Sequence, residues 1–253
     1  MEKIAIISDI HSNLVALEAV LKDIEKRGIN RIFCLGDIVF KGSSTCEVVD
    51  RIKDKCEIVI KGNCDDAIVN APKESKRRSW YKEQLGEERI EYLKNLPLYK
   101  DFYMSGSYVR MFHATKNDLY NRIFAVDPIE KKKNMFQEEG KEPDIILYGD
   151  IHQQYMQKLQ NKTIVNVGSV GNSVYFPDYD ESITNMEETT QAFYCIIEGE
   201  YNAKERGSIS IQFVRIPYDI EKEIELAKEK QIPDLEAYII ELTKAKYFKR
   251  ANK

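Results

Sequence analysis

The 253-residue sequence predicts an α/β protein. In its first half, short apolar runs typical of strands alternate with segments whose apolar residues recur at helical spacing. From residue 98 onward strand-like runs dominate, and the tail is helical again. Polar residues follow several of the apolar runs directly, and ligands of such sheets collect outside the carboxyl ends of the strands. The pattern therefore predicts an α/β fold with a ligand-binding site at the carboxyl ends of its strands.

The first half is interpreted as a βαβαβ unit. Strands are expected at 3–7, 31–35 and 57–60, with helices from Leu14 to Lys26 and near 45–53. The first helix has one apolar stripe, which comprises Leu14, Leu17, Val20, Leu21 and Ile24. Such a unit has parallel strands joined by right-handed crossovers.

The rest of the chain adds strands and two helical segments. A charged stretch at about 66–96 is interpreted as a helical insertion over or beside the site, and 219–246 as two helices broken at Pro233. Between them, one helix is expected around 129–139 and a polar, acidic loop at 177–191. The further strands are expected at 98–103, 108–113, 144–148, 153–159, 162–167, 192–198 and 208–216. One domain spanning 1–253 accommodates these elements.

Composition excludes several classes of function. The chain is 43% hydrophobic and 32% charged, which is typical of a soluble globular protein. Its net charge of -4 argues against general nucleic-acid binding, and no apolar run has the length of a membrane span. The first residues enter a strand directly, so no signal peptide is expected. Five cysteines, an odd number without a Cys-x-x-Cys pair, indicate reduced thiols and a cytoplasmic location.

All three histidines, His11, His113 and His152, stand at the ends of apolar runs. Imidazole is the commonest neutral ligand of catalytic transition metals. Two further runs lead into Gly36-Asp37 and into Gly62-Asn63-Cys64-Asp65. The pattern favours one metal site that uses every histidine of the chain.

The ordered motifs resemble those of the calcineurin-like metallophosphoesterases. The set comprises Asp9-x-His11, Gly36-Asp37, Gly62-Asn63-x-Asp65, the lone His113 and Gly149-x-x-His152. Five motifs in order are far more specific than any one of them. The resemblance implies a four-layer α/β/β/α metallophosphoesterase sandwich with a helical insertion and C-terminal helices. Each residue also has an ordinary interpretation, since Asp9 could cap a helix, Asp37 and Asn63 could form turns, and His113 could be a core histidine.

The resemblance implies two metal ions and a ligand set for each. One ion would be held by Asp9, His11, Asp37 and His152, and the other by Asp37, Asn63, His113 and position 150. Two-metal sites hold their ions ~3.5–4 Å apart, and a bridging water that loses a proton near neutral pH is the nucleophile. Manganese and iron are the expected metals, with magnesium, nickel and zinc as alternatives.

Two residues depart from the family pattern. Asp150 stands where the family usually has histidine; ligation is favoured, and the alternative is that it turns away and leaves the second ion weakly held. Cys64 stands where many members have a histidine that helps to protonate the leaving group. A thiol is a poor acid, which favours substrates whose leaving group is already stable as an anion; the alternative is that Cys64 merely packs its loop. The expected catalytic residues are Asp37, Asn63, Cys64 and Asp65.

Substrate contacts are predicted from two weaker signals. The Gly168-Ser169 loop resembles a family loop whose backbone N–H groups could approach a phosphate, but it could equally be a plain tight turn. Arg77 and Arg78, on the insertion, could clamp a polyphosphate, although most such pairs are solvated.

The resemblance extends to a bacterial branch through Tyr148–Gln154 and Arg215–Ile220. That branch contains atypical diadenosine tetraphosphatases, which split their substrate asymmetrically into ATP and AMP. The first hypothesis is therefore a metal-dependent phosphodiesterase or dinucleoside polyphosphate hydrolase with a small nucleotide as its partner, and homodimerisation is left open. The alternatives are a cyclic-nucleotide or generic phosphodiesterase, and a degenerate binding module such as the retromer subunit of this fold.

Overall fold

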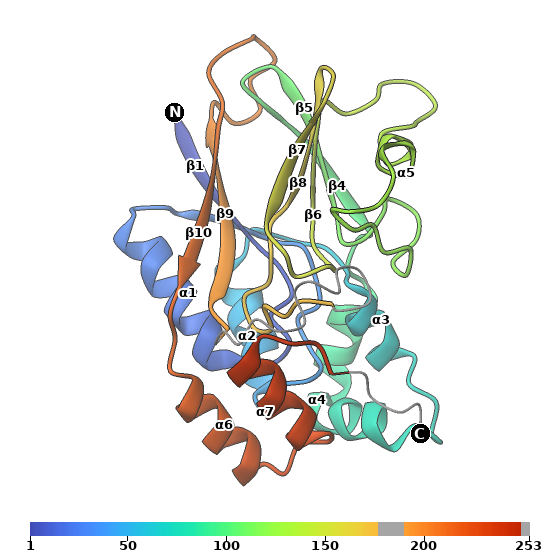
Figure 1. Ribbon diagram of the computed structural model, residues 1–253, viewed down its shortest axis with the longest axis vertical. Coiled ribbons are helices and arrows are strands. Elements are labelled where there is room, and N and C mark those ends of the chain that lie inside the picture. The colour runs from blue at the N-terminus through green and yellow to red at the C-terminus, as the bar shows by residue number, and fades with distance from the viewer. Residues whose placement is uncertain (177–189, 249–253) are drawn as a thin grey trace.

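The structure is a computed structural model that describes residues 1–176 and 190–248, and two five-stranded sheets form its centre (Figure 1). Both sheets contain parallel and antiparallel pairs, and helices flank them. This is the predicted α/β sandwich, and the prediction is confirmed. Most of the predicted loop at 177–191 lies outside the described residues.

The first sheet has the strand order β10-β9-β1-β2-β3. Its strands are β1 (Glu2–Ile7), β2 (Arg31–Cys34), β3 (Ile58–Val59), β9 (Ala192–Gly199) and β10 (Ser210–Ile216). β1 pairs in parallel with β2, and β2 pairs in parallel with β3, as the predicted βαβαβ unit requires. β9 and β10 extend the sheet by antiparallel pairing. The carboxyl ends of β1, β2 and β3 therefore meet at one edge of the sheet.

The second sheet has the strand order β4-β5-β6-β8-β7. Its strands are β4 (Tyr99–Met104), β5 (Ser107–Phe112), β6 (Ile145–Tyr148), β7 (Tyr155–Leu159) and β8 (Lys162–Asn166). The central pairs β5–β6 and β6–β8 are parallel, whereas β4 and β7 join as antiparallel edge strands. The carboxyl ends of β5 and β6 are consequently adjacent.

The core follows the two-residue alternation of β1. Ile4 and Ile6 belong to the buried cluster that also contains Met111 and other apolar residues of the second sheet. Ala5 and Ile7, which point to the opposite face, belong to the cluster that contains the apolar stripes of α1 (Leu14–Lys26) and α2 (Thr45–Lys55). One apolar layer thus lies between the two sheets, and another lies between the first sheet and its helices.

Helix α1 has the predicted bounds. Its N-cap is Asn13, whose side-chain oxygen accepts a hydrogen bond of 2.9 Å from the backbone N–H of Ala16. α5 (Ile129–Asn134) is shorter than the predicted helix at 129–139. α6 (Ile220–Glu229) and α7 (Leu235–Lys244) are separate helices on either side of Pro233, as predicted. In the part of the chain that the structure describes, no helix has both the length and the apolar character needed to cross a membrane.

The predicted helical segment at 66–96 is two helices, α3 (Asn63–Val69) and α4 (Lys76–Lys94). The break lies at 70–75 around Pro72, because proline cannot continue a helix in its interior. α3 starts earlier than predicted because the Asp65 carboxylate accepts a hydrogen bond of 2.9 Å from the backbone N–H of Gly62 and caps the helix. Asn63 and Cys64 therefore occupy the first turn of a helix.

Candidate metal centre

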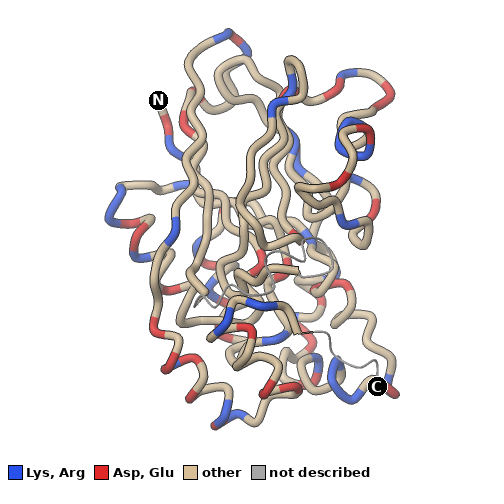
Figure 2. The backbone as a smooth tube through the Cα atoms, viewed as in Figure 1, with Lys and Arg blue, Asp and Glu red and all other residues tan. Residues whose placement is uncertain are grey.

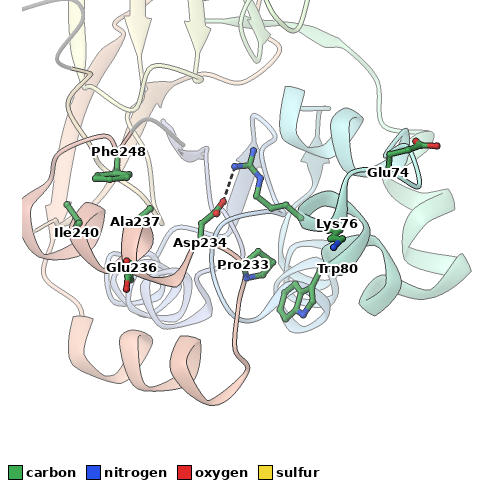
Figure 3. A pocket seen from close by; sticks show the side chains of 10 residues that line it. Glu74, Lys76, Trp80, Pro233, Asp234, Glu236, Ala237, Ile240 and Phe248 are labelled. Atoms are coloured by element: carbon green, nitrogen blue, oxygen red, sulfur yellow. Dashed lines mark hydrogen bonds and ion pairs between the residues drawn. The ribbon is translucent and has the colours of Figure 1, made fainter. Parts of the chain in front are cut away.

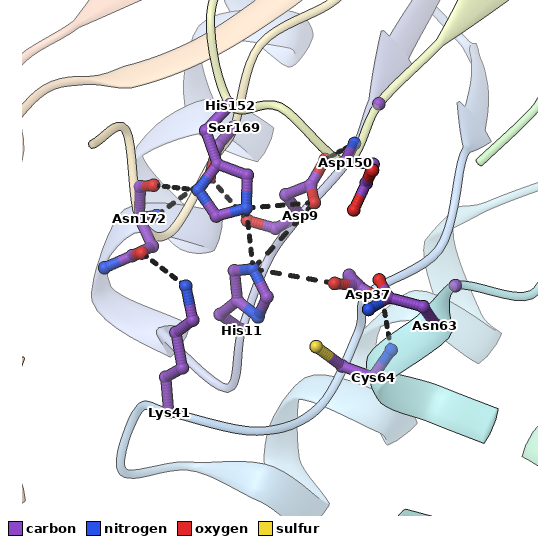
Figure 4. Close-up of polar contacts among 12 residues, drawn as sticks. Asp9, His11, Asp37, Lys41, Asn63, Cys64, Asp150, His152, Ser169 and Asn172 are labelled. Carbon is purple, nitrogen blue, oxygen red and sulfur yellow. Dashed lines mark hydrogen bonds and ion pairs between the residues drawn. The ribbon is translucent and has the colours of Figure 1, made fainter. Parts of the chain in front are cut away.

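Seven polar side chains converge where the carboxyl ends of the strands of both sheets meet, and Figure 4 labels all of them except His113. The first sheet supplies four of them from the loops after β1 and β2 and from the start of α3, and the second sheet supplies three from the loops after β5 and β6. They are Asp9, His11, Asp37, Asn63, His113, Asp150 and His152. All except the half-buried Asn63 are buried. The structure thus brings together every residue that was predicted to bind metal, although the residues span 144 positions of sequence from 9 to 152.

Unusual backbone conformations point these side chains at one another. Asp9, His11, Asp37, Asp150 and His152 all have φ between 49° and 67°, in the left-handed region that residues other than glycine seldom adopt. Such conformations persist only where neighbouring interactions enforce them. Here the backbone N–H groups of Asp9 and His11 donate to the carbonyls of Gly36 (3.0 Å) and Asp37 (2.9 Å), so the two loops hold each other.

A first group of ligand atoms surrounds the ring nitrogen His11 Nε2. This atom lies 3.1 Å from His152 Nε2, 3.8 Å from Asp9 Oδ1 and 3.7 Å from Asp37 Oδ2. His152 Nε2 is also 3.3 Å from Asp9 Oδ1. Two imidazoles and two carboxylates therefore face one small volume.

A second group surrounds His113 Nε2, on the other side of Asp37. Asp37 Oδ1 lies 3.3 Å from this nitrogen, Asn63 Oδ1 lies 3.0 Å from it and Asp150 Oδ1 lies 3.8 Å from it. The amide oxygen of Asn63 is also 3.1 and 3.2 Å from the two carboxylate oxygens of Asp37. Oxygens at such distances repel one another, and either a cation or a half-turn of the amide removes that repulsion. Asp37 presents one oxygen to each group.

The histidine rings are oriented for ligation through Nε2. His113 Nδ1 lies 2.8 Å from the carbonyl of Leu35, and His152 Nδ1 lies 2.5 Å from the carbonyl of Asn172. A ring nitrogen that donates its proton to a carbonyl leaves the other nitrogen of a neutral ring as a free acceptor, and metal-binding histidines are commonly fixed in this way. Asp9 Oδ1 is buried and makes no hydrogen bond within the described residues. The donor set therefore fits metal cations.

The electrostatics of the cluster also favour positive charge. Burial lowers the pKa of His113, but the charges of Asp37, Asp9 and Asp150 outweigh it and raise the pKa to about 9. For the carboxyl group of Asp9 burial acts in the opposite direction and raises the pKa. The neighbouring His152 outweighs burial and lowers the pKa of Asp9 to about 2. Burial lowers the pKa of His11 well below its ordinary value, so this ring is neutral. Three carboxylates thus create a field that holds a proton on His113 until another cation takes its place.

Asp150 has a partner that the sequence did not reveal. Its two oxygens accept hydrogen bonds from Arg122, at 3.0 Å from Nε and 2.9 Å from Nη2. Arg122 lies in the irregular segment between β5 and α5, which carries no motif or periodicity. The signal that could have found it is the replacement of a neutral histidine by a carboxylate, since a buried charge requires a counter-charge. Asp150 Oδ1 remains close to His113, at 3.8 Å.

The comparisons with known proteins agree with this geometry. Residues 2–187 match the model of the calcineurin-like phosphoesterase superfamily domain. The chain belongs to the calcineurin-like phosphoesterase superfamily. It is therefore a metallophosphoesterase-type phosphoester hydrolase, and the family implies divalent metal ions.

Relatives of this phosphoesterase match it over nearly their whole length. An uncharacterised protein of Methanocaldococcus jannaschii is 30% identical over 242 residues, which cover 91% of this chain and 94% of that protein. A metallophosphoesterase from Sphaerobacter thermophilus has a TM-score of 0.73 at 23% identity, with 96% and 99% of the two chains covered. A hypothetical protein from Pyrococcus horikoshii OT3 has a TM-score of 0.77 at 18% identity, with 98% and 100% covered. The two structures share the fold of this phosphoesterase.

Cys64 lies beside the ligand cluster of the phosphoesterase. Its Sγ is within 4.8 Å of a ring nitrogen of His11 and an oxygen of Asp37, and its backbone N–H donates to Asp37 Oδ1 at 2.7 Å. Burial and the charge of Asp37 raise the pKa of the thiol well above its ordinary value. A thiol with a raised pKa is a weak acid, as the sequence argument expected of Cys64.

Asp65, which was predicted to be catalytic, has a positioning role in the structure. Its carboxylate accepts hydrogen bonds from the backbone N–H groups of Ile38 (2.9 Å), Val39 (3.2 Å) and Gly62 (2.9 Å). Burial and the charge of Asp37 raise its pKa to about 7, against the effect of those donors. Asp65 therefore joins the loop that carries Asp37 to the loop that carries Asn63.

Gly168 and Ser169 support the first motif. Ser169 is fully buried, and its hydroxyl donates to the carbonyl of Asp9 at 2.8 Å. The backbone N–H of Gly168 donates to Asn166 Oδ1 at 3.1 Å, and that of Gly171 donates to the carbonyl of Asp9 at 3.0 Å. The loop therefore directs these donors to the protein, which differs from the phosphate contact predicted for it.

The structure does not place Arg77 in the cluster. Its Nη1 donates to Asp234 Oδ2 at 2.9 Å, and its guanidinium lies 4.9 Å from the ring centre of Phe40. Arg77 lines a pocket of about 810 Å³ between α4 and α7, and none of the seven clustered residues lines it (Figure 3). Arg78 is half-buried on α4, and its charge acts on the nearby Tyr120 hydroxyl. A substrate contact by either arginine stays a prediction.

Proposed function

We propose that this protein is a two-metal enzyme that hydrolyses phosphoanhydride or phosphodiester bonds of nucleotides, with asymmetric cleavage of diadenosine tetraphosphate as its first candidate reaction. The observation that supports this most directly is the position of Asp37, which presents one oxygen to His11 and the other to His113. A single carboxylate between two groups of nitrogen and oxygen ligands is the arrangement that a dinuclear site needs.

In this proposal the ligands divide as the family pattern implies. Asp9, His11, Asp37 and His152 hold one ion, and Asp37, Asn63, His113 and Asp150 hold the other. The bound ions supply a water of lowered pKa and neutralise negative charge on the phosphoryl group. The preponderance of oxygen ligands in the second group favours manganese or iron, with magnesium also compatible.

The leaving group is the feature that selects the substrate. Cys64 occupies the edge of the cluster, and its burial keeps the thiol protonated but makes it a weak acid. A departing alkoxide needs a proton, whereas a departing phosphate or aryl oxide is already stable as an anion. Anhydrides and aryl diesters are therefore the favoured substrates, and alkyl phosphomonoesters are disfavoured.

The proposed setting is the cytoplasm, with a small nucleotide as the partner. All five cysteines are free thiols in the structure, which supports a reducing compartment.

The test is metal analysis of the purified protein followed by turnover of a small panel. The panel comprises diadenosine tetraphosphate, cyclic AMP, bis(p-nitrophenyl) phosphate and an alkyl phosphomonoester. We expect about two ions per chain, rapid cleavage of the tetraphosphate to ATP and AMP, and slow cleavage of the monoester. Turnover of the diester and cyclic AMP without the tetraphosphate favours the generic phosphodiesterase. Absence of bound metal and of all turnover contradicts the proposal and favours a binding module.

A further inference from the structure

We propose that Arg122 binds phosphoryl oxygens of the substrate and stabilises the charge of the departing phosphate, with Asp150 as the residue that positions it. This inference rests on the proposed function, because it names the group that meets the leaving phosphate at the same site.

The guanidinium of Arg122 is fixed in orientation. Its Nε and Nη2 donate in parallel to the two oxygens of Asp150, at 3.0 and 2.9 Å. A bidentate pair of this kind sets the plane and direction of the guanidinium as well as its position. Nη1 makes no hydrogen bond with residues 1–176 or 190–248, so this edge of the fork is left for a ligand.

Aromatic packing and the backbone hold the arginine from the other sides. The guanidinium carbon lies 4.9 Å from the ring centre of Phe176 and 6.0 Å from that of Phe124. The carbonyl of Arg122 accepts a hydrogen bond of 3.0 Å from Lys131 Nζ. The side chain nevertheless keeps 36% of its surface exposed. Arg122 is thus a rigid cation that faces both the buried cluster and the solvent from which substrate arrives.

Arg122 also lies beside the proposed second metal position, where a phosphoryl group would bind. Asp150 Oδ1, which it binds, is 3.8 Å from His113 Nε2, so one carboxylate separates the guanidinium from the proposed second metal position. Burial lowers the pKa of Arg122, but the charge of Asp150 outweighs burial and raises the pKa above its ordinary value.

The pair Asp150–Arg122 replaces a neutral histidine without changing the net charge. The charges of the carboxylate and the guanidinium sum to zero, but the positive charge lies on the outer side of Asp150, toward the solvent from which substrate arrives. When a phosphoanhydride is hydrolysed, an oxygen from water bonds to phosphorus, the P–O bond to the departing phosphate breaks, and the electron pair stays on that oxygen. The guanidinium, which Asp150 holds beside the proposed second metal position, is placed to stabilise this charge.

Other cations near the site are already committed to different partners. Lys41 Nζ donates to Asn172 Oδ1 at 2.7 Å, behind His152, and Arg77 pairs with Asp234. Arg122 is bonded directly to a member of the cluster, which distinguishes it from both.

The first measurement is binding of inorganic phosphate, by isothermal titration calorimetry, to protein loaded with Mn²⁺ and dialysed. We expect Arg122→Met to weaken phosphate binding by roughly tenfold or more, and Arg122→Lys to lie between it and the wild type, because a charge-assisted hydrogen bond to the phosphate is lost. Metal content should stay unchanged. Arg89→Met is the matched control, since Arg89 forms the same type of bidentate pair with Asp50 on the surface of α4. It should bind phosphate as the wild type does.

A second variant allows for misfolding when Asp150 loses its partner. Arg122→Gln keeps an amide that can donate a hydrogen bond to Asp150 without touching a proposed metal ligand, and it should show the same loss of phosphate binding as Arg122→Met. Equal affinity in the wild type and Arg122→Met, or no measurable phosphate binding by the metal-loaded wild type, overturns the inference. So does loss of metal in both Arg122 variants, which makes the arginine a support for the ligands.

The leaving group provides an independent readout. Across a series of aryl phosphodiesters, the rate loss in Arg122→Met should grow as the aryl oxide becomes a poorer leaving group. A loss that is uniform across the series contradicts stabilisation of the leaving group. If the wild type hydrolyses nothing, the proposed function fails, while the phosphate titration still decides whether Arg122 binds phosphoryl oxygens.

Discussion

At the scale of single residues, Asp37 is shared between the two groups of ligand atoms, so its replacement tests the dinuclear proposal. Asp37→Asn removes a charged ligand from both positions at once, and we expect loss of both ions and of nearly all activity. Elemental analysis of the purified variant measures this. Asp54→Asn, which changes an exposed carboxylate on α2, serves as the control. Full metal occupancy in Asp37→Asn would show that the two-metal assignment is wrong.

Cys64 gives a second residue-scale prediction, which concerns substrate choice. Cys64→His introduces an acid of suitable pKa at the edge of the cluster, and general acid catalysis is worth about 10²–10⁴-fold where the leaving group needs a proton. Turnover of an alkyl phosphomonoester should therefore rise proportionally more than that of diadenosine tetraphosphate. Rates are compared at matched pH and metal, with Cys46→His as a control outside the cluster. An equal effect on both substrates refutes the leaving-group argument.

The sequence predicted the site residues that belong to local motifs, but it did not predict Arg122, which belongs to none. Asp9, His11 and His152 stand at strand ends with recognisable spacing, and the structure brings them together. Arg122 comes from an irregular loop, and only the three-dimensional fold brings it to Asp150. Asp65, which was also predicted to be catalytic, accepts hydrogen bonds from the backbone of two loops, and a catalytic role for it stays a prediction.

At the scale of elements, the turn between β3 and α3 approaches the Asp37 loop so closely that only glycine fits. A Cβ on Gly62 would lie 2.1 Å from the backbone nitrogen of Asp37 and 2.2 Å from its Oδ1. Gly62→Ala should therefore displace Asp37, lower the free energy of unfolding by about 1–3 kcal/mol and reduce metal occupancy. Denaturant unfolding and metal analysis measure the two effects.

The control for that substitution is Gly207→Ala, because the nearest atom to its added Cβ lies at an ordinary contact distance of 3.4 Å. It should change neither quantity appreciably. If Gly62→Ala retains wild-type stability and metal content, the two loops are less tightly coupled than the structure indicates.

Glu223, a buried carboxyl group on α6, should make the free energy of unfolding depend on pH. Glu223 is fully buried, accepts hydrogen bonds from the Ser43 N–H (3.2 Å) and the Tyr238 hydroxyl (3.1 Å), and has its pKa raised by burial to about 7. Between pH 4.5 and 7 the folded protein therefore binds this proton more strongly than the unfolded chain does. Its contribution is stabilising below that window and is lost as pH rises through it.

From pH 4.5 to 8, the free energy of unfolding of the wild type should fall by about 3 kcal/mol more than that of Glu223→Gln, which cannot ionise. Chemical denaturation at a series of pH values, with EDTA present throughout, measures the difference. Glu225→Gln on the exposed side of α6 should follow the wild type. Parallel pH curves for the wild type and Glu223→Gln contradict the buried titration.

Element boundaries followed the sequence where local signals were strong. α1 matches its predicted bounds because an amphipathic stripe and the Asn13 cap agree. The insertion was predicted as one helical stretch, and the structure divides it at 70–75 because Pro72 interrupts it and a tertiary contact of Asp65 starts α3 early. Tertiary contacts of this kind produce no periodic pattern of apolar residues, so the sequence alone does not predict them.

At the scale of the whole molecule, the metal centre joins the two sheets. Asp9, His11, Asp37 and Asn63 come from the first sheet, whereas His113, Asp150 and His152 come from the second. The family pattern predicted the members of this site, but the pairing of the sheets across an apolar layer is what brings His113 within 3.3 Å of Asp37 and His152 within 3.3 Å of Asp9. Three buried carboxylates, in turn, repel one another across that junction until cations neutralise them.

Metal should therefore stabilise the whole fold. A ligand present at 100 times its Kd stabilises the folded state by about 2.7 kcal/mol per site, and 1 kcal/mol corresponds to roughly 2–4 °C for a chain of this size. We expect Mn²⁺ to raise the thermal midpoint by roughly 5–10 °C per occupied site relative to protein in EDTA, as measured by differential scanning calorimetry. Asp37→Asn, which lacks the shared ligand, should show little metal-dependent shift, and Asp54→Asn should show the full shift. Identical midpoints with Mn²⁺ and with EDTA in the wild type would mean that the cluster binds no metal under these conditions and that its carboxylates are balanced by the protein alone.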